Sequence, residues 1–356
     1  MKYFLLVFLL SFQTHALVSS WSSTLPQNSR FKVSKEMQKR VDFWVKIYSH
    51  YTTSQGVFHL VDDPSKILGE IDLTSIHQNK VLNDTQKRKL IDAEIKKKRQ
   101  LYITRHKIKN PRQVRLQMGL KDRMRKAFYL SGKYLPQMEE IFEKENLPIE
   151  LTRLVFVESS FNVYAQSKVG ASGLWQIMPF VARPKGYITN HYDKRNHPVY
   201  ATKLAAQILK QNHRSLKSWP LAVTAYNHGL TGVKRMMQRS EAVSIEGLIR
   251  SQNPTRTWGF ASKNFYACFL AVLEVERRAT DLFGDNLLKA HALSFREYKL
   301  PEATNKDVVL KWFGGSMTRF RQMNPHLNWA VIRNRQSVPA GVPLMIPEQN
   351  FYLVAN

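Results

Sequence analysis

The segment Leu151–Pro179 has the sequence LTRLVFVESSFNVYAQSKVGASGLWQIMP. Helical spacing over residues 151–158 places Leu151, Leu154 and Val155 on the same face as Glu158. A carboxyl group held against an apolar face loses hydration, and this raises its pKa toward the range that a general acid needs near neutral pH. A lone glutamate in such a place more often pairs with a buried arginine, so the helix by itself does not establish catalysis.

The second half of the segment, Gly170–Pro179, is a turn rich in small residues followed by amide and aromatic groups. Glycines allow a sugar chain to approach the backbone closely. Trp175 offers a stacking face and Gln176 a two-way hydrogen-bonding amide, which suits a sugar with hydroxyl and acetamido groups. The alternative interpretation is an ordinary glycine turn with a core tryptophan.

Three motifs together resemble a known family. Glu158–Asn162, Gly170–Pro179 and Ala225–Gly229 are similar, in order and spacing, to the motifs of soluble-type lytic transglycosylases, glycoside hydrolase family 23. Within that family the closest resemblance is to the membrane-bound lytic murein transglycosylase D type, because Phe31–Tyr51 and Gly132–Pro136 also look like its N-terminal part.

The resemblance implies a mainly helical, lysozyme-like catalytic domain and a role for six side chains. It implies that Glu158 is the single acid and base. The other five would contact the glycan or shape the cleft around it: Ser167, Gln176, Met178, Tyr226, which in relatives hydrogen-bonds the catalytic carboxylate, and Asn227.

The chain departs from the family pattern at a few positions. His228 stands where relatives have a small residue, and this is expected to reshape the cleft beside Tyr226. His197, before Pro198, replaces an acidic residue, which is expected to alter only a helix cap. Phe180 and Val181 fall where a threonine is usual. None of these removes a catalytic group.

The stretch after Glu158 is poor in acidic residues. Between Ser159 and Arg235 the only one is Asp193, in the motif Asp193-Lys194-Arg195, which in the family looks structural. Glycosidases of the usual kind need two carboxyl groups. The resemblance implies a reaction with one: Glu158 protonates the β-1,4 oxygen between MurNAc and GlcNAc, and the sugar's own C6 hydroxyl attacks to give 1,6-anhydroMurNAc. A peptidoglycan hydrolase (lysozyme) on the same fold remains the alternative.

Composition changes along the chain predict its organisation. Residues 1–16 have a lysine followed by a short apolar run, as in a signal peptide, so we expect export to the periplasm or medium and no membrane span afterwards. Residues 29–132 are basic and predict a helical arm, and residues 133–288 predict the helical catalytic domain. No alternating strand pattern is evident before residue 300. Residues 300–350 resemble a degenerate LysM module, a small α+β unit that in relatives binds glycan.

The chain has 356 residues, 43% of them hydrophobic, and a formal net charge of +27. This charge predicts a polyanionic partner, and export favours the cell wall with its peptide carboxylates over nucleic acid. We therefore expect peptidoglycan glycan strands as the partner, a monomer, and no metal or cofactor. A non-catalytic wall-binding protein is the competing class of function.

Overall fold

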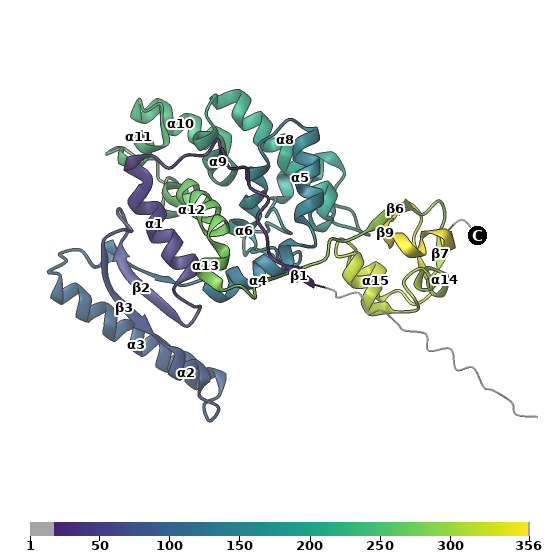
Figure 1. The fold of residues 1–356 in the computed structure, drawn as a ribbon, viewed down its shortest axis with the longest axis horizontal. Coiled ribbons are helices and arrows are strands. Elements are labelled where there is room, and N and C mark those ends of the chain that lie inside the picture. The colour runs from purple at the N-terminus through teal and green to yellow at the C-terminus, as the bar shows by residue number, and fades with distance from the viewer. Residues whose placement is uncertain (1–17, 355–356) are drawn as a thin grey trace, which may run out of the picture.

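The computed structural model describes residues 18–354, so the expected signal peptide at 1–16 lies outside the described residues. The chain is mainly helical, as predicted, and Figure 1 shows a central helical body with a sheet and a long helix on one side and a small module on the other. No helix among residues 18–354 is long and apolar enough to cross a membrane.

The N-terminal part differs from the all-helical arm that the sequence predicts. Three strands form an antiparallel sheet in the order β3-β2-β4, and α3 packs against it through Tyr102. Alternation of apolar and polar residues does not reveal the central strand β2, because its sequence QGVFHL is buried on both sides. The elements here are β1 (Val18–Ser20), α1 (Lys35–Ser49), β2 (Gln55–Leu60), β3 (Ile67–Asp72), α2 (Thr74–Gln78), α3 (Asp84–Arg105), the 3₁₀ turn η1 (Pro111–Gln113), β4 (Val114–Met118) and α4 (Lys121–Ser131).

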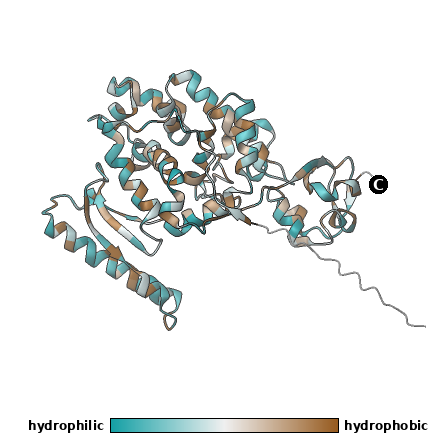
Figure 2. Cartoon of the chain, in the orientation of Figure 1, coloured by the Kyte–Doolittle hydropathy of each residue, from teal (hydrophilic) through white to brown (hydrophobic). Residues whose placement is uncertain are grey.

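Helix α3 projects its basic side into solvent. Asn83 and Gln86 form a capping box at its start, and Tyr102 is its one buried side chain. Hydrophilic colour dominates this helix in Figure 2. The lysines of this helix therefore lie on a largely solvated face.

The central body is built around α12, which packs against α1, α6 and α9. Nearly every side chain from Phe265 to Val275 is buried, as the apolar sequence predicts. Helices α1 and α4 share this core, although both precede residue 133. The elements are α5 (Leu135–Lys144), η2 (Ile149–Arg153), α6 (Leu154–Glu158), α7 (Pro179–Ala182), η3 (Arg183–Lys185), η4 (Lys194–Asn196), α8 (Pro198–Leu216), α9 (Trp219–His228), α10 (Leu230–Ser240), α11 (Ile245–Arg250), α12 (Phe260–Arg277) and α13 (Ala279–Phe283).

The C-terminal module is a small α+β unit with its own core, which includes Phe313, Phe320 and Leu344. Strands β6 and β9 pair antiparallel, and so do β7 and β8, with three short helices between β7 and β8. The elements from here on are β5 (Leu288–Ala290), which pairs with β1, then β6 (Phe295–Lys299), β7 (Thr304–Asn305), α14 (Lys306–Lys311), α15 (Met317–Met323), α16 (Trp329–Arg333), β8 (Ser337–Val338), β9 (Pro343–Pro347) and η5 (Glu348–Val354).

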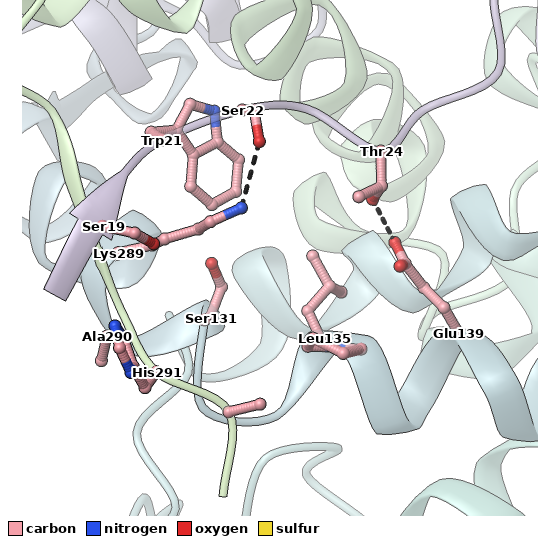
Figure 3. A pocket seen from close by; sticks show the side chains of 13 residues that line it. Ser19, Trp21, Ser22, Thr24, Ser131, Leu135, Glu139, Lys289, Ala290 and His291 are labelled. Atoms are coloured by element: carbon pink, nitrogen blue, oxygen red, sulfur yellow. Dashed lines mark hydrogen bonds between the residues drawn. The ribbon is translucent and has the colours of Figure 1, made fainter. Parts of the chain in front are cut away.

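A buried ion pair joins the body to the N-terminal segment. Arg153 is fully buried and binds Glu276 of α12 through two hydrogen bonds, from Nε at 2.8 Å and from Nη2 at 2.7 Å. Its guanidinium also bonds Glu139 of α5 and the hydroxyl of Thr24. Figure 3 shows Thr24 reaching Glu139 beside a cavity of about 440 Å³ that β1 and the start of α5 line.

Removing Arg153 should therefore be costly. In Arg153→Met, Glu276 loses its partner while it stays buried, and we expect a loss of about 3–5 kcal/mol in the free energy of unfolding. The control is Arg250→Met, because the Arg250–Glu36 pair lies on the surface, and it should cost less than about 1 kcal/mol. Urea denaturation of both variants measures the difference. Equal, small losses would contradict this view of the core.

Candidate active site

Glu158 ends helix α6 and is only partly buried, whereas Leu151, Leu154 and Val155 beneath it are completely buried. This is the apolar face that the sequence predicts. Among residues 18–354, no group donates a hydrogen bond to its carboxyl oxygens, and burial alone raises its pKa from 4.5 to about 8. The carboxyl group is thus set to be protonated at neutral pH.

Tyr226 lies in the same site but does not make the bond that the family resemblance implies. Its hydroxyl donates instead to the backbone oxygen of Trp175, at 2.8 Å. Burial, followed by the charge of Glu158, raises the pKa of Tyr226 well above its ordinary value. Tyr226 is therefore a neighbour of Glu158 that holds the Gly170–Pro179 turn in place.

One further side chain near Glu158, Tyr48, is not among the predicted site residues, and Cys268 lies behind it. Tyr48 of α1 is buried, and its pKa is raised by burial first, then by Cys268 of α12 and by the charge of Glu158. Burial raises the pKa of the Cys268 thiol to about 12, so this cysteine is an inert packing residue. Because Tyr48 and Cys268 are far from the motifs in sequence, only the packing of α1 on α12 could reveal them.

The chain turns sharply directly after Glu158. Ser160 and Phe161 both adopt left-handed backbone conformations, with φ of 51° and 58°. Such conformations are costly for non-glycine residues and recur at functional sites. The hydroxyl of Ser159 donates to the backbone oxygen of Leu174, at 2.8 Å, and so ties this turn to the second motif.

Trp175 and Gln176 of the second motif, both expected to contact a sugar, have different environments in the structure. Trp175 is fully buried, stacks on Phe142 and donates to the hydroxyl of Thr202, so the prediction of a sugar-stacking face is wrong and the core alternative holds. Gln176 is partly exposed and left-handed, with φ of 46°. Its amide nitrogen donates to the backbone oxygens of Ala165 and Gly173. Its amide oxygen accepts no hydrogen bond from residues 18–354.

The remaining predicted site residues lie around the same motifs. Ser167 is partly exposed, and its hydroxyl accepts from the backbone N–H of Ala171 at 2.9 Å. Met178 is partly exposed just before α7. Asn227 is exposed in the last turn of α9, which ends at Gly229 with φ of 85°, as its sequence predicts.

Asp193 has a structural role, because it forms an ion pair with Arg195. Its carboxylate accepts hydrogen bonds from Nε and Nη2 of Arg195, and the Arg195 Nη1 donates to the backbone oxygens of Gly170 and Ile177. The pair thus holds both ends of the second motif together. Gly173 sits against the same arginine: a Cβ there would lie 2.1 Å from the Arg195 backbone oxygen.

His197 does more than alter a helix cap. Its ring makes no capping bond, is completely buried, and lies 3.4 Å from the carboxylate of Glu297 in β6. Burial raises the pKa of Glu297, but the contact with the His197 ring and the hydrogen bond from the Tyr200 hydroxyl outweigh burial and lower this pKa to about 2. The departure from the family pattern therefore builds a contact with the C-terminal module.

His228, the last residue of α9, contacts the start of α12 and the residue Trp258 before it. Its Nδ1 pairs with the hydroxyl of Ser262 at 2.8 Å, and its ring meets Trp258 edge to face. No trio of histidine, cysteine or carboxylate side chains within residues 18–354 is arranged to hold a metal ion.

The C-terminal module is fastened to the body by main-chain and side-chain bonds. Asp193 N–H donates to His326 O at 2.7 Å, and Asn328 donates to the backbone oxygens of His191 and Thr189. The hydroxyl of Tyr164, close to the first motif, donates to Arg321 O at 3.3 Å. This places α15 and α16 beside the candidate site.

Part of the chain is similar to known proteins. Residues 138–249 match the model of the transglycosylase SLT domain. Membrane-bound lytic murein transglycosylase D of Escherichia coli (strain K12) is 35% identical over 102 residues, which are 28% of this chain and 23% of that protein. The chain therefore matches less than a quarter of that relative's length.

Two solved structures are also similar. One is an inactive mutant of the lytic transglycosylase Slt from Pseudomonas aeruginosa, with 21% identity, a TM-score of 0.32, and coverage of 41% of this chain and 24% of that one. The other is the 70 kDa soluble lytic transglycosylase SLT70 from Escherichia coli, with 20% identity, a TM-score of 0.31, and coverage of 42% and 25%. By the family model and the Escherichia coli relative, part of this chain, including residues 138–249, is similar to the transglycosylase SLT domain.

Proposed function

We propose that this chain is a peptidoglycan lytic transglycosylase that uses Glu158 as its only acid and base. The observation that carries the proposal is the desolvated carboxyl group of Glu158, with its pKa near 8, inside a transglycosylase SLT domain. A carboxylic acid that is still protonated at neutral pH can donate its proton to a leaving oxygen.

The proposed reaction needs no second carboxylate. Glu158 protonates the β-1,4 oxygen between MurNAc and GlcNAc while the C1–O bond breaks, and the acetamido oxygen of MurNAc stabilises the positive charge at C1. The C6 hydroxyl of the same sugar then attacks C1 and returns its proton to Glu158. Asp193, the nearest acidic residue along the chain after Glu158, is already bound to Arg195.

The other side chains would bind and orient the glycan. The free amide oxygen of Gln176 would accept a hydrogen bond from a sugar hydroxyl or an acetamido N–H. Ser167, Met178 and Asn227 are all at least partly exposed and would contact the strand. Tyr226 would act as a positioning residue through its bond to Trp175 O.

We further propose the domain organisation that the sequence predicts. Residues 133–288 would be a lysozyme-like catalytic domain, and residues 300–350 a LysM-like module that binds glycan. In support, an exposed tryptophan, Trp329, lines a groove of about 210 Å³ between the module and the body. Export of the chain stays a prediction.

Replacing Glu158 tests the catalytic assignment. Glu158→Gln keeps the shape of the side chain but cannot transfer the proton, so release of muropeptides from purified sacculi should fall by at least about 10²-fold. Asp193→Asn is the matched control: it should lower activity only through the stability of the second motif. Mass spectrometry of the wild-type products should show anhydro ends. Reducing ends would mean a hydrolase, and binding to sacculi without any soluble product would mean a non-catalytic wall-binding protein.

The pKa of Glu158 can be tested without substrate. Because its folded-state pKa of about 8 lies above 4.5, Glu158 contributes stability below pH 4.5 that is lost as pH rises through 8. Glu158→Gln has no such loss. The unfolding free energy of the variant minus that of the wild type should therefore increase from pH 4 to pH 9, by at most about 5 kcal/mol.

The control for this measurement is Glu143→Gln, at an exposed carboxylate of α5, and it should show no such trend. Denaturant titrations across the pH range give both differences. A flat difference for Glu158→Gln would contradict the desolvation of Glu158.

Glycan binding by the C-terminal module can be tested at its exposed tryptophan, Trp329. Trp329→Ala removes the ring that borders the groove, and we expect sedimentation with sacculi to weaken by about 5- to 20-fold. Tyr352→Ala, at an equally exposed aromatic away from the groove, is the control. Equal binding by the wild type and both variants would contradict glycan binding at this groove.

A further inference from the structure

A cavity of about 660 Å³ lies beside the turn that follows Glu158. Its walls come from three parts of the chain that are distant in sequence: helix α4 and the residues after it, the turn 159–164, and α15 of the C-terminal module through Gln322. Two of these walls, α4 and α15, lie outside residues 138–249, so the transglycosylase SLT domain does not account for this cavity.

The cavity is positively charged. Arg123, Lys126 and Lys133 line it, and no acidic side chain does. Within residues 18–354 none of these three cations has a carboxylate within 4 Å. A hollow that holds uncompensated charges of one sign concentrates ligands of the opposite sign.

The floor and the rim of the cavity are well ordered by packing. Phe161, Val163 and Tyr134 line it and are buried. On the rim, the bond from the Tyr164 hydroxyl to Arg321 O holds α15 against the turn. The backbone segments that line the cavity are therefore held by packing, whereas Arg123 and Lys126 extend from exposed positions of α4.

The cavity is also close to the candidate catalytic residue. Ser159, the first residue of its wall, directly follows Glu158, and consecutive Cα atoms are about 3.8 Å apart. In peptidoglycan the MurNAc next to the scissile bond carries a peptide. A peptide of four or five residues spans about 13–17 Å when it is extended, which sets how far a stem can extend from a glycan bound at Glu158.

We propose that this cavity binds the carboxylates of the peptide stem attached to MurNAc. The inference rests on the proposed function and extends it: the enzyme would select glycan that carries peptides over naked glycan. Arg123 and Lys126 would pair with stem carboxylates, and Tyr134, Phe161 and Val163 would pack against the aliphatic parts of the stem. The concave shape favours a short, branched anion such as this over a flat membrane surface.

The test compares two substrates that differ only in the peptide. One is purified glycan strands with their stems, and the other is the same strands after an amidase has removed the stems. The variant is Arg123→Gln/Lys126→Gln, at two exposed positions of α4 where the fold should tolerate the change. The control is Lys96→Gln/Lys97→Gln, which removes the same charge from exposed positions of α3.

The wild type should cleave the peptide-bearing strands with the higher kcat/KM. In the α4 variant the ratio of kcat/KM on peptide-bearing to naked strands should fall by about 5- to 20-fold, chiefly through KM, because two ion pairs are lost. The α3 control should keep the wild-type ratio. High salt should lower the wild-type ratio as well, because it screens exposed charges.

Three outcomes would overturn the inference. Unchanged kcat/KM on both substrates in the α4 variant would mean that the cavity takes no stem, and an equal loss on both substrates would mean that its charges act on the glycan alone. An α3 control that loses as much selectivity would mean that net charge, and not this cavity, recognises the peptide. If the wild type cleaves neither substrate, the proposed function itself fails, which is a separate result.

Discussion

The pair of Arg153 and Glu276 is the contact on which the rest of the body depends. It joins the start of the Glu158 segment to α12, and through Thr24 and Glu139 it also holds the N-terminal segment and α5. A charge pair in the core is stable only when its hydrogen bonds are satisfied, and here the guanidinium has a partner on each side. Because Glu158 follows Arg153 by a single short helix, this pair also fixes the position of the candidate catalytic carboxyl group.

The charge chemistry of the site follows from this packing. Arg153 and Glu276 form an ion pair, whereas Glu158 accepts no hydrogen bond from residues 18–354 and has a pKa of about 8 because of burial alone. Glu276 is a structural carboxylate because a cation lies beside it. Glu158 has no cation beside it, and its carboxyl group is therefore available as an acid. Asp193 is structural in the same way as Glu276. It binds Arg195, and Arg195 in turn donates a hydrogen bond to the second motif.

Much of this arrangement could be predicted from the sequence because it is local. The apolar face under Glu158, the buried helix α12 and the end of α9 at Gly229 all follow from periodicity or from one residue type. What could not be predicted depends on contacts between distant parts of the chain. The sequence suggests that Trp175 stacks on a sugar, but in the structure Phe142 stacks on its ring and the side chain is buried. His197 looks like a weak helix cap until Glu297 of the C-terminal module lies against it. Strand β2 of the N-terminal sheet does not show the alternation of apolar and polar residues that predicts a strand, because both of its faces are buried.

The central claim is that one desolvated carboxyl group suffices because the sugar supplies the nucleophile. The most direct measurement is digestion of sacculi in water enriched in oxygen-18, followed by mass spectrometry of the newly formed sugar ends. If the C6 hydroxyl is the nucleophile, the new MurNAc ends contain no oxygen from the solvent and are lighter than a reducing end by one water. Incorporation of one solvent oxygen at each new end would show that water attacks, and the one-carboxylate account would then be wrong.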